Sequence, residues 1–238
     1  MLYMNNNFWI KTGIDHTKNL LKFIGNDFDD TKFLNETFTN LFTKNLKDLN
    51  IEDGKLKSYV LSWFELKNII VNWKEKSSKD NSFRIEMKHF ESLYMIIDKN
   101  GTYWQFFQEV SDEKEEFEIE INKVFQKVLK TKYLKPTLEK LLIFCHKIYL
   151  DGLFGRYTSL FVWLLLQLFL IFKNFAPIIT LVDKNTQILW LFPLINMLYN
   201  ELSCLPMAKW KRSPYFKKVF NYCYANSYSY KIKIKNIL

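Results

Sequence analysis

Residues 157–172 read YTSLFVWLLLQLFLIF, a long apolar stretch near the middle of the second half of the chain. Within residues 160–172, twelve of thirteen side chains are apolar, and only Gln167 interrupts them. A helix of this length spans about 24 Å, less than the roughly 30 Å hydrocarbon core of a bilayer. The stretch therefore predicts a helix buried on all sides within a helical domain. A membrane-spanning helix is the alternative, because Arg156 and Lys173 could reach toward lipid headgroups.

Periodic apolar residues predict further helices around this stretch. Pro136 begins a predicted helix that runs to Asp151, and Gly152 is a suitable C-terminal cap for it. The same spacing predicts helices over residues 30–49, 58–74 and 113–130.

Other segments lack the helical period and predict extended structure. Residues 93–98 and 102–110 flank Asn100-Gly101, and this spacing predicts a β-hairpin near residues 93–110. Residues 1–14 are expected to be an extended lead-in, and the alternation in residues 228–235 predicts an exposed or edge strand. The predicted fold is mainly α, a helical bundle with a small β-hairpin and an N-terminal extension.

The excess positive charge lies entirely in the second part of the chain. The net charge of +9 belongs to residues 136–238, whereas the first 135 residues are neutral overall. No acidic residue follows Glu201. We expect residues 1–135 to be a neutral, mostly helical extension and residues 136–238 to be a basic helical domain with a C-terminal tail that faces a polyanion.

The choice of amino acids indicates an AT-rich genome. Of the 34 basic residues only three are arginine, and alanine occurs three times. Seven tryptophans are unexpected under the standard code, whose tryptophan codon contains two G's, but not under a code that also reads TGA as tryptophan. Such codes are common in mitochondria, so a mitochondrial origin is predicted, with a eukaryotic parasite or an AT-rich virus as the alternative.

No catalytic or metal-binding constellation emerges. His16, His89 and His146 are far apart, and the three cysteines show no metal spacing. Cys145 and His146 are adjacent and so diverge on a helix, Cys145 as a core residue and His146 at its boundary. Because phosphate-loop, nucleophile-elbow and zinc motifs are also missing, no enzymatic activity, cofactor or metal is expected.

Lysines interleaved with aromatic residues near the C-terminus are typical of RNA binding, since cations neutralise phosphates and rings stack on unpaired bases. The predicted RNA-binding residues of this region are Lys209, Trp210, Lys211, Arg212, Lys217, Lys218, Lys231, Lys233 and Lys235.

Short motifs in residues 138–233 resemble the small-ribosomal-subunit protein seven family. Residues 141–152 (LLIFCHKIYLDG) resemble its first core helix, and residues 173–177 (KNFAP) resemble the end of a later helix. Residues 200–203 (NELS) and Ala225-Asn226 resemble two stretches near its C-terminus.

This resemblance implies a largely helical domain that binds the 3′ major domain of small-subunit ribosomal RNA. It adds Lys184 and Asn226 as RNA contacts, although the family's Arg-Arg and Gly-Gly hairpin residues are absent around residues 183–187.

Two functions follow as expectations. The first is a structural constituent of the mitochondrial small ribosomal subunit, a ribonucleoprotein of translation in the matrix, where this protein would bind rRNA and neighbouring ribosomal proteins. The second is an accessory subunit of a respiratory complex in the mitochondrial inner membrane, with a membrane helix near residues 157–172.

Overall fold

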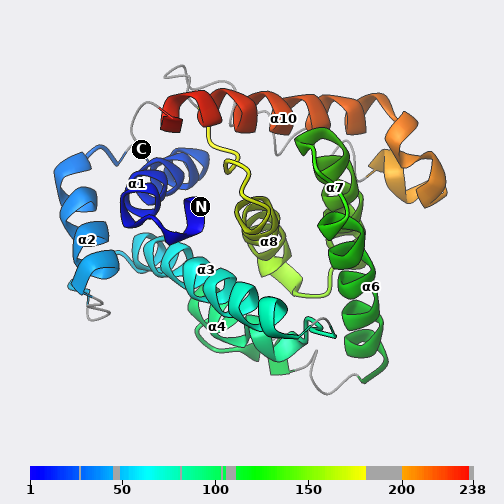
Figure 1. Ribbon diagram of the computed structural model, residues 1–238, viewed down its shortest axis with the longest axis horizontal. Helices are drawn as coiled ribbons and strands as arrows, with labels where there is room; N and C mark the ends of the chain where they lie inside the picture. Colours follow the sequence, from blue (N-terminus) through cyan, green and yellow to red (C-terminus); the bar gives the residue numbers. More distant parts are fainter. Residues whose placement is uncertain are drawn as a thin grey trace.

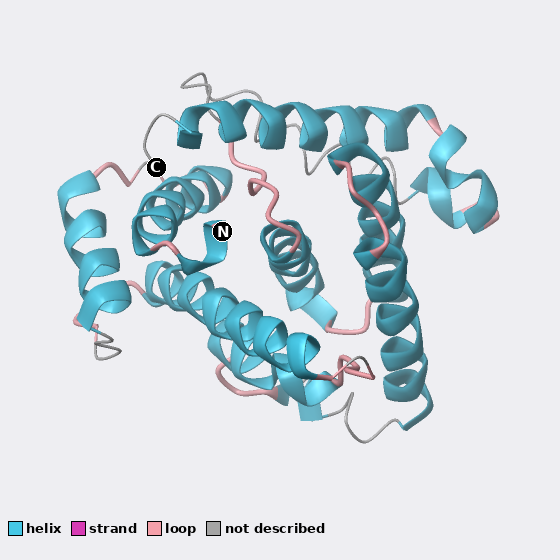
Figure 2. Cartoon of the chain, viewed as in Figure 1, coloured by secondary structure: helices cyan, strands magenta, loops and turns pink. Residues whose placement is uncertain are grey.

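The computed structural model describes residues 1–26, 28–44, 49–80, 82–102, 104–105, 111–180 and 200–235. Helices dominate this part of the chain, and none of it is a β-strand (Figures 1 and 2). The longer helices are α1 (Asn6–Phe23), α2 (Thr31–Lys44), α3 (Gly54–Lys79), α4 (Glu91–Ile97), α6 (Ser111–Leu129), α7 (Leu134–Asp151), α8 (Thr158–Phe172) and α10 (Pro214–Lys235). Short 3-10 turns are η1 (Leu2–Met4), η2 (Met87–Phe90), η3 (Gly155–Tyr157) and η4 (Met207–Arg212).

Helix α8 lies at the centre of the molecule, surrounded by the other helices (Figure 1). Twelve of its fifteen residues are buried, as predicted for an apolar core helix. By length and composition, Gly155–Phe172 is the one segment of the described chain that could cross a membrane. Here protein surrounds it, mainly helices α7 and α3.

Helix α7 confirms the strongest sequence prediction. It ends at Gly152, whose φ of 64° is left-handed and whose N–H donates to the Ile148 carbonyl at 3.1 Å. It begins at Leu134, two residues before the predicted Pro136. Proline is tolerated there because the N–H groups of a first helical turn have no partner within the helix.

The predicted β-hairpin is wrong. Residues 91–97 form helix α4, whose buried side chains Leu93, Tyr94 and Ile97 have helical spacing. The Asn-Gly turn follows this helix, and the Gly101 N–H donates to the Asp98 carbonyl at 2.9 Å. In the second predicted arm, residues 102, 104 and 105 are helical, and the others lie outside the described residues. The turn was identified, but it ends a helix instead of joining two strands.

The ends of the chain are also helical where extended structure was predicted. Residues 6–14 belong to α1, which buries the polar Thr12, His16 and Thr17 beside its apolar residues. Residues 228–235 belong to α10, in which Ile232 is 54% exposed while Ile234 is buried. Two isoleucines two positions apart therefore face opposite ways, as on a helix, whereas in a strand residues i and i+2 share one face.

Both parts of the chain contribute to one core. Trp73 of α3 lies 5.9 Å from Phe169 and 6.1 Å from Phe172 of α8, measured between ring centroids. Tyr94 of α4 lies 5.3 Å from Phe154. These aromatic contacts join residues 1–135 to residues 136–238, so α8 is enclosed by helices from both.

An extended segment, residues 175–180, leads away from α8 through the interior. The Gln167 side chain forms hydrogen bonds with the backbone of Ile178, in the middle of this segment. The Ile178 N–H donates to the Gln167 Oε1 at 2.8 Å, and the Gln167 Nε2 donates to the Ile178 carbonyl at 3.4 Å. Asn19 of α1 forms the same pair of side-chain hydrogen bonds with the backbone N–H and carbonyl of Thr180. The Ser227 hydroxyl of α10 donates to the Ala176 carbonyl at 2.7 Å. The single polar residue of the apolar stretch therefore satisfies backbone groups that water cannot reach.

Replacing Gln167 by leucine is expected to lower the free energy of unfolding by about 3 kcal/mol, because the buried Ile178 N–H and carbonyl lose their partners. Urea unfolding followed by circular dichroism measures this loss. Gln126→Leu on the exposed side of α6 is the matched control, and we expect it to change stability by less than about 0.5 kcal/mol. Equal stability of the two variants would contradict this role of Gln167.

Candidate nucleic-acid interface

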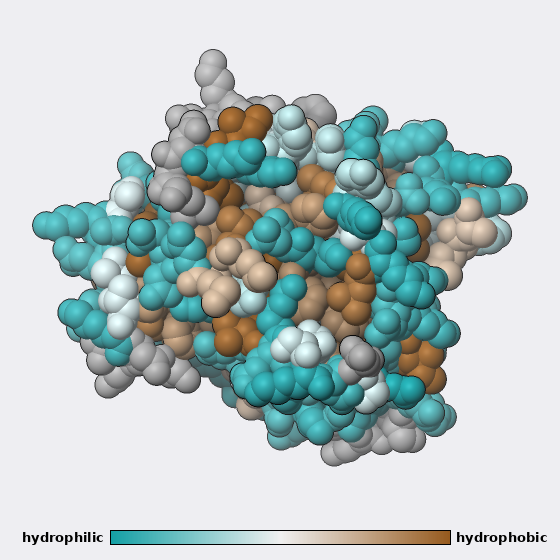
Figure 3. Space-filling view, in the orientation of Figure 1, coloured by the Kyte–Doolittle hydropathy of each residue, from teal (hydrophilic) through white to brown (hydrophobic). Residues whose placement is uncertain are grey.

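The lysines and arginine predicted to bind RNA lie on η4 and α10, at the outer edge of the molecule (Figure 1). We call their exposed members the basic face: Lys209, Lys211, Arg212, Lys217, Lys218, Lys231 and Lys235. Lys233 is half-buried. In Figure 3, mostly hydrophilic residues cover the projecting end of the molecule at the upper right, where Figure 1 places η4.

Trp210 anchors η4 and does not belong to the exposed surface. Its indole is 6% exposed, and its Nε1–H donates to the carbonyls of Leu202 and Leu205 at 3.2 and 2.9 Å. The Trp210 ring, which was predicted to stack on RNA bases, is therefore packed inside the protein. Its burial turns the flanking Lys209 and Lys211 outward to solvent.

The start and register of α10 follow from its sequence. The Ser213 hydroxyl accepts the Phe216 N–H at 3.1 Å, and Pro214 occupies the first helical position. Buried residues then recur every three or four positions, at Phe216, Val219, Cys223, Ser227, Tyr230 and Ile234. This buried stripe leaves the lysines on the opposite, solvated side.

Two of the predicted cations form ion pairs within the protein. Lys211 lies 3.2 Å from Glu139 of α7, and Lys233 lies 3.2 Å from Asp15 of α1. In the described part of the chain, the remaining cations of the basic face have no acidic side chain within 4.0 Å. Uncompensated charge of this kind is available to a polyanion.

The family resemblance implied two RNA contacts, Asn226 and Lys184, and the structure describes only the first. Asn226 is half-buried on α10, and its Nδ2 donates to the Tyr222 carbonyl at 2.9 Å. Its amide is therefore partly used within its own helix. Lys184 lies outside the described residues, as does the apolar stretch at residues 188–199.

An aromatic ladder on α10 was missed by the sequence analysis. Phe220, Tyr224 and Tyr228 stack in series, with ring centroids 6.2 and 6.1 Å apart and interplanar angles of 6° and 22°. The Nζ of Lys135, at the start of α7, lies 5.0 Å from the Tyr224 ring centroid. The three rings are four residues apart in the sequence, a spacing that brings side chains together on a helix. Predicting a strand over residues 228–235 concealed this signal.

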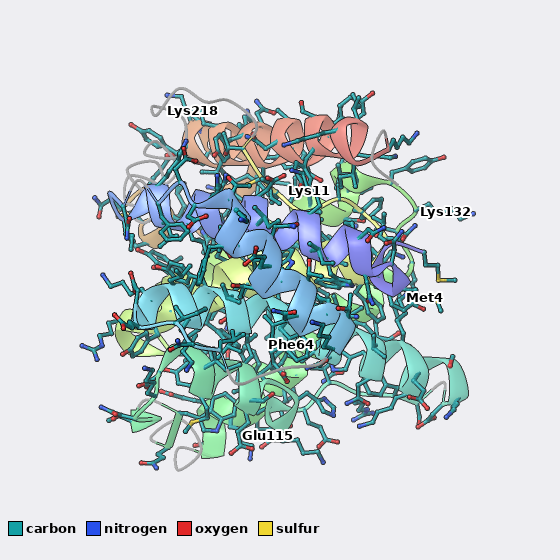
Figure 4. All side chains as sticks on the ribbon, turned by 90° about the vertical axis from the view of Figure 1, so that its left-hand side faces the viewer. Met4, Lys11, Phe64, Glu115, Lys132 and Lys218 are labelled. Carbon is teal, nitrogen blue, oxygen red and sulfur yellow. The ribbon has the colours of Figure 1, made fainter. Side chains whose placement is uncertain are left out.

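Charge is polarised across the molecule. Figure 4 shows Lys218 and Glu115 at opposite edges, with α10 along the one and the start of α6 at the other. The acidic residues at the start of α6 are Asp112, Glu113, Glu115, Glu116, Glu118 and Glu120. Such a dipole orients the basic face toward an approaching anion.

Two of the three cysteines, Cys145 and Cys223, lie with His146 in an apolar environment, whereas Cys204 is exposed. A small cavity of about 50 Å³ is lined by Cys145, His146 and Cys223, among mainly apolar residues. Burial raises the pKa of the Cys145 thiol, raises that of Cys223 to about 12 and lowers that of His146 to about 4. These groups are therefore neutral at pH 7, and His146 is a core residue and not the boundary residue predicted. Among the described residues, no three His, Cys, Asp or Glu side chains gather to hold a metal ion.

Two buried histidines are expected to make the fold acid-sensitive. Burial lowers the pKa of His16 to about 3 and that of His146 to about 4, both below the ordinary value of 6.5. The unfolded chain therefore binds more protons below pH 6.5, and the free energy of unfolding falls by about 1.4 kcal/mol per histidine for each pH unit toward those lower values. Urea unfolding at several pH values measures this slope. His16→Gln should remove one histidine's share, and an unchanged slope would contradict the assignment.

Comparison with protein-family models, with curated proteins and with solved structures finds no match to this chain. Its function is therefore inferred from its own surface, charge and core.

Proposed function

We propose that this protein is a structural, RNA-binding constituent of the small subunit of a mitochondrial ribosome. The observation that carries the proposal is the basic face, where η4 and α10 present seven exposed cations to solvent. Lysine and arginine side chains on a helical framework bind phosphates and release counterions without any catalytic chemistry. The buried, neutral Cys145, Cys223 and His146 agree with a scaffolding role.

The form of α10 favours RNA over a lipid surface as the polyanion. A helix that lies in a membrane interface inserts an apolar face between lipid headgroups. The apolar stripe of α10 is already buried against the protein, with Phe216, Val219 and Cys223 each about 2% exposed or less. The solvated side carries lysines with Asn221 and Ser229, and the large hydrophobic side chains exposed on α10 are limited to Tyr228 and Ile232 among the described residues. Such a surface meets phosphates without needing to enter a bilayer.

The ribosomal and mitochondrial parts of the proposal have separate support. The resemblance over residues 138–233 supports a small-subunit protein that binds the 3′ major domain of the rRNA. The amino-acid composition supports an organelle genome and hence the mitochondrial matrix. Residues 1–135 are neutral overall, which suits contact with neighbouring ribosomal proteins more than with RNA.

Gradient sedimentation of detergent-solubilised mitochondria, with this protein followed by mass spectrometry, tests the proposal. We expect it to sediment with the small ribosomal subunit and to leave that fraction after ribonuclease treatment. Sedimentation with a respiratory complex, unaffected by ribonuclease, would overturn the proposal and favour the membrane-subunit alternative. Extraction of membranes with alkaline carbonate distinguishes the same two cases, since a ribosomal protein is released.

A further inference from the structure

We propose that the exposed end of the aromatic ladder, Tyr228, is a stacking platform for an unpaired base of single-stranded RNA. The lysines around it would hold the phosphates on either side of that base. This inference rests on the proposed function in taking RNA as the partner, and it adds where and in what form the RNA binds.

Aromatic residues spaced four positions apart on α10 become more exposed toward the C-terminal end of the helix. Residues four positions apart are rotated by about 40° on an α-helix, so such a row drifts around the helix axis. Phe216 is 2% exposed, Phe220 and Tyr224 are half-buried, and Tyr228 is 51% exposed. Half-buried rings thus restrict the orientation of an exposed one, and little ordering is left for the ligand to impose on it.

The Tyr228 ring is accessible to a ligand, since its residue is 51% exposed. Within the described part of the chain its ring contact is with Tyr224, with planes 22° apart and centroids 6.1 Å apart. The next residue in the row is Ile232, which is 54% exposed and has no ring with which to continue the stack. A planar base is the group that extends such a series, because every base offers a π-face whatever its sequence.

Cations lie along α10 before and after this platform, and one approaches the ladder from α7. Lys231 is three residues beyond Tyr228 on the same side of α10, and Lys235 is one turn further. Lys217 precedes Tyr224 by seven residues, two turns along the same side of the helix. Lys135 reaches the ladder from α7, 5.0 Å from the Tyr224 centroid. Phosphates before and after a stacked base would thus meet lysine on both sides of the ladder.

The arrangement favours single strands over duplexes. Bases inside a duplex are already stacked on one another, so a duplex offers the lysines its phosphates but offers Tyr228 no free base. A membrane surface also offers phosphates and no planar base. Removal of the ring should therefore affect single-stranded RNA alone.

The test compares Tyr228→Leu with Tyr228→Phe in the full-length protein. Fluorescence anisotropy measures the affinity for a labelled oligouridine and for an RNA duplex of equal length. We expect Tyr228→Leu to weaken oligouridine binding by roughly tenfold, since stacking on an aromatic side chain contributes a factor of this order per base. Tyr228→Phe keeps the π-face and should retain affinity. Duplex binding should change by less than about twofold in both variants, because the phosphate contacts are unaltered.

Three outcomes would overturn the inference, and they separate it from the proposed function. If Tyr228→Leu binds oligouridine as the wild type does, the platform is wrong while RNA binding stands. If it loses oligouridine and duplex affinity equally, the residue supports the fold and not a base. If the wild type binds vesicles containing phosphatidylserine but neither RNA, both the inference and the proposed function fail.

Discussion

Reversing four charges of the basic face is expected to weaken RNA binding on the order of 100-fold and to flatten its salt dependence. The variant carries Lys209, Arg212, Lys217 and Lys218 replaced by glutamate. None of these four is ion-paired within the described residues, and Lys218 loses only an exposed cation–π contact, its Nζ lying 5.4 Å from the Tyr215 ring centroid. Each phosphate contact removed should lower the slope of log affinity against log salt by about one for a duplex and by roughly 0.7 for a single strand. Fluorescence anisotropy over a series of salt concentrations measures both quantities.

The fold itself should survive this variant. Lys217 and Lys218 lie near the N-terminus of α10, where glutamate interacts favourably with the helix dipole. A matched control reverses four exposed lysines elsewhere, Lys32 and Lys44 on α2 with Lys55 and Lys76 on α3, and gives the same net charge. Equal loss of RNA affinity in the two variants would show that only net charge matters and would contradict a localised interface.

Truncating Trp73 to alanine is expected to cost about 4 kcal/mol, the largest single loss of stability in this fold. Its indole is fully buried and forms ring contacts with Phe83, His89, Phe90, Phe125, Phe169 and Phe172. The cavity left behind would lie between α3, α6 and α8, which cannot easily collapse because each is packed on other helices. Urea unfolding measures the change, with the 41%-exposed Val71→Ala on the same helix as its control.

The same experiment tests whether the chain unfolds as one unit. Since Trp73 joins residues 1–135 to α8, its loss should lower the stability of both parts together. Hydrogen exchange followed by mass spectrometry resolves the two parts, and we expect protection to fall in α3 and in α7 alike. Loss of protection confined to α3 would mean that the first part folds separately from the second.

Where burial was uniform or periodic, the sequence predicted the fold well. The twelve apolar residues around Gln167 led to a core helix, and proline and glycine marked the limits of α7 to within two residues. The prediction failed where polar residues are buried. In α1 the buried side chains include Thr12, His16 and Thr17, so hydropathy showed no helical stripe. The partner of His16 comes from a distant helix, since the Trp163 indole donates to the His16 Nε2 at 3.2 Å, whereas the Thr12 hydroxyl donates to the Phe8 carbonyl of its own helix.

Of the candidate site, the charge could be predicted and the roles of the aromatic residues could not. A run of cations without acids is exposed in almost any fold, because burying unpaired charge is prohibitive. The role of an aromatic residue depends on the side of the helix it occupies. Trp210 is buried and Tyr228 is exposed, although both lie among lysines in the sequence. Because residues 228–235 were predicted to be a strand, Tyr228 was not expected on the same helix as Phe220 and Tyr224. The aromatic ladder was therefore not predicted.

The contact between Asp15 and the last helix constrains when the protein becomes functional. The Asp15 Oδ2 accepts from the Tyr230 hydroxyl at 2.8 Å across a sequence separation of 215 residues, and the Lys233 Nζ lies 3.2 Å from the same oxygen. At about 5–20 residues per second, a ribosome needs roughly 10–40 s to synthesise the chain between these partners. During that time α1 has been synthesised, but α10 with its Asp15 partners has not. The surface proposed to bind RNA is thus made long after α1, and a chain terminated before residue 209 would lack it.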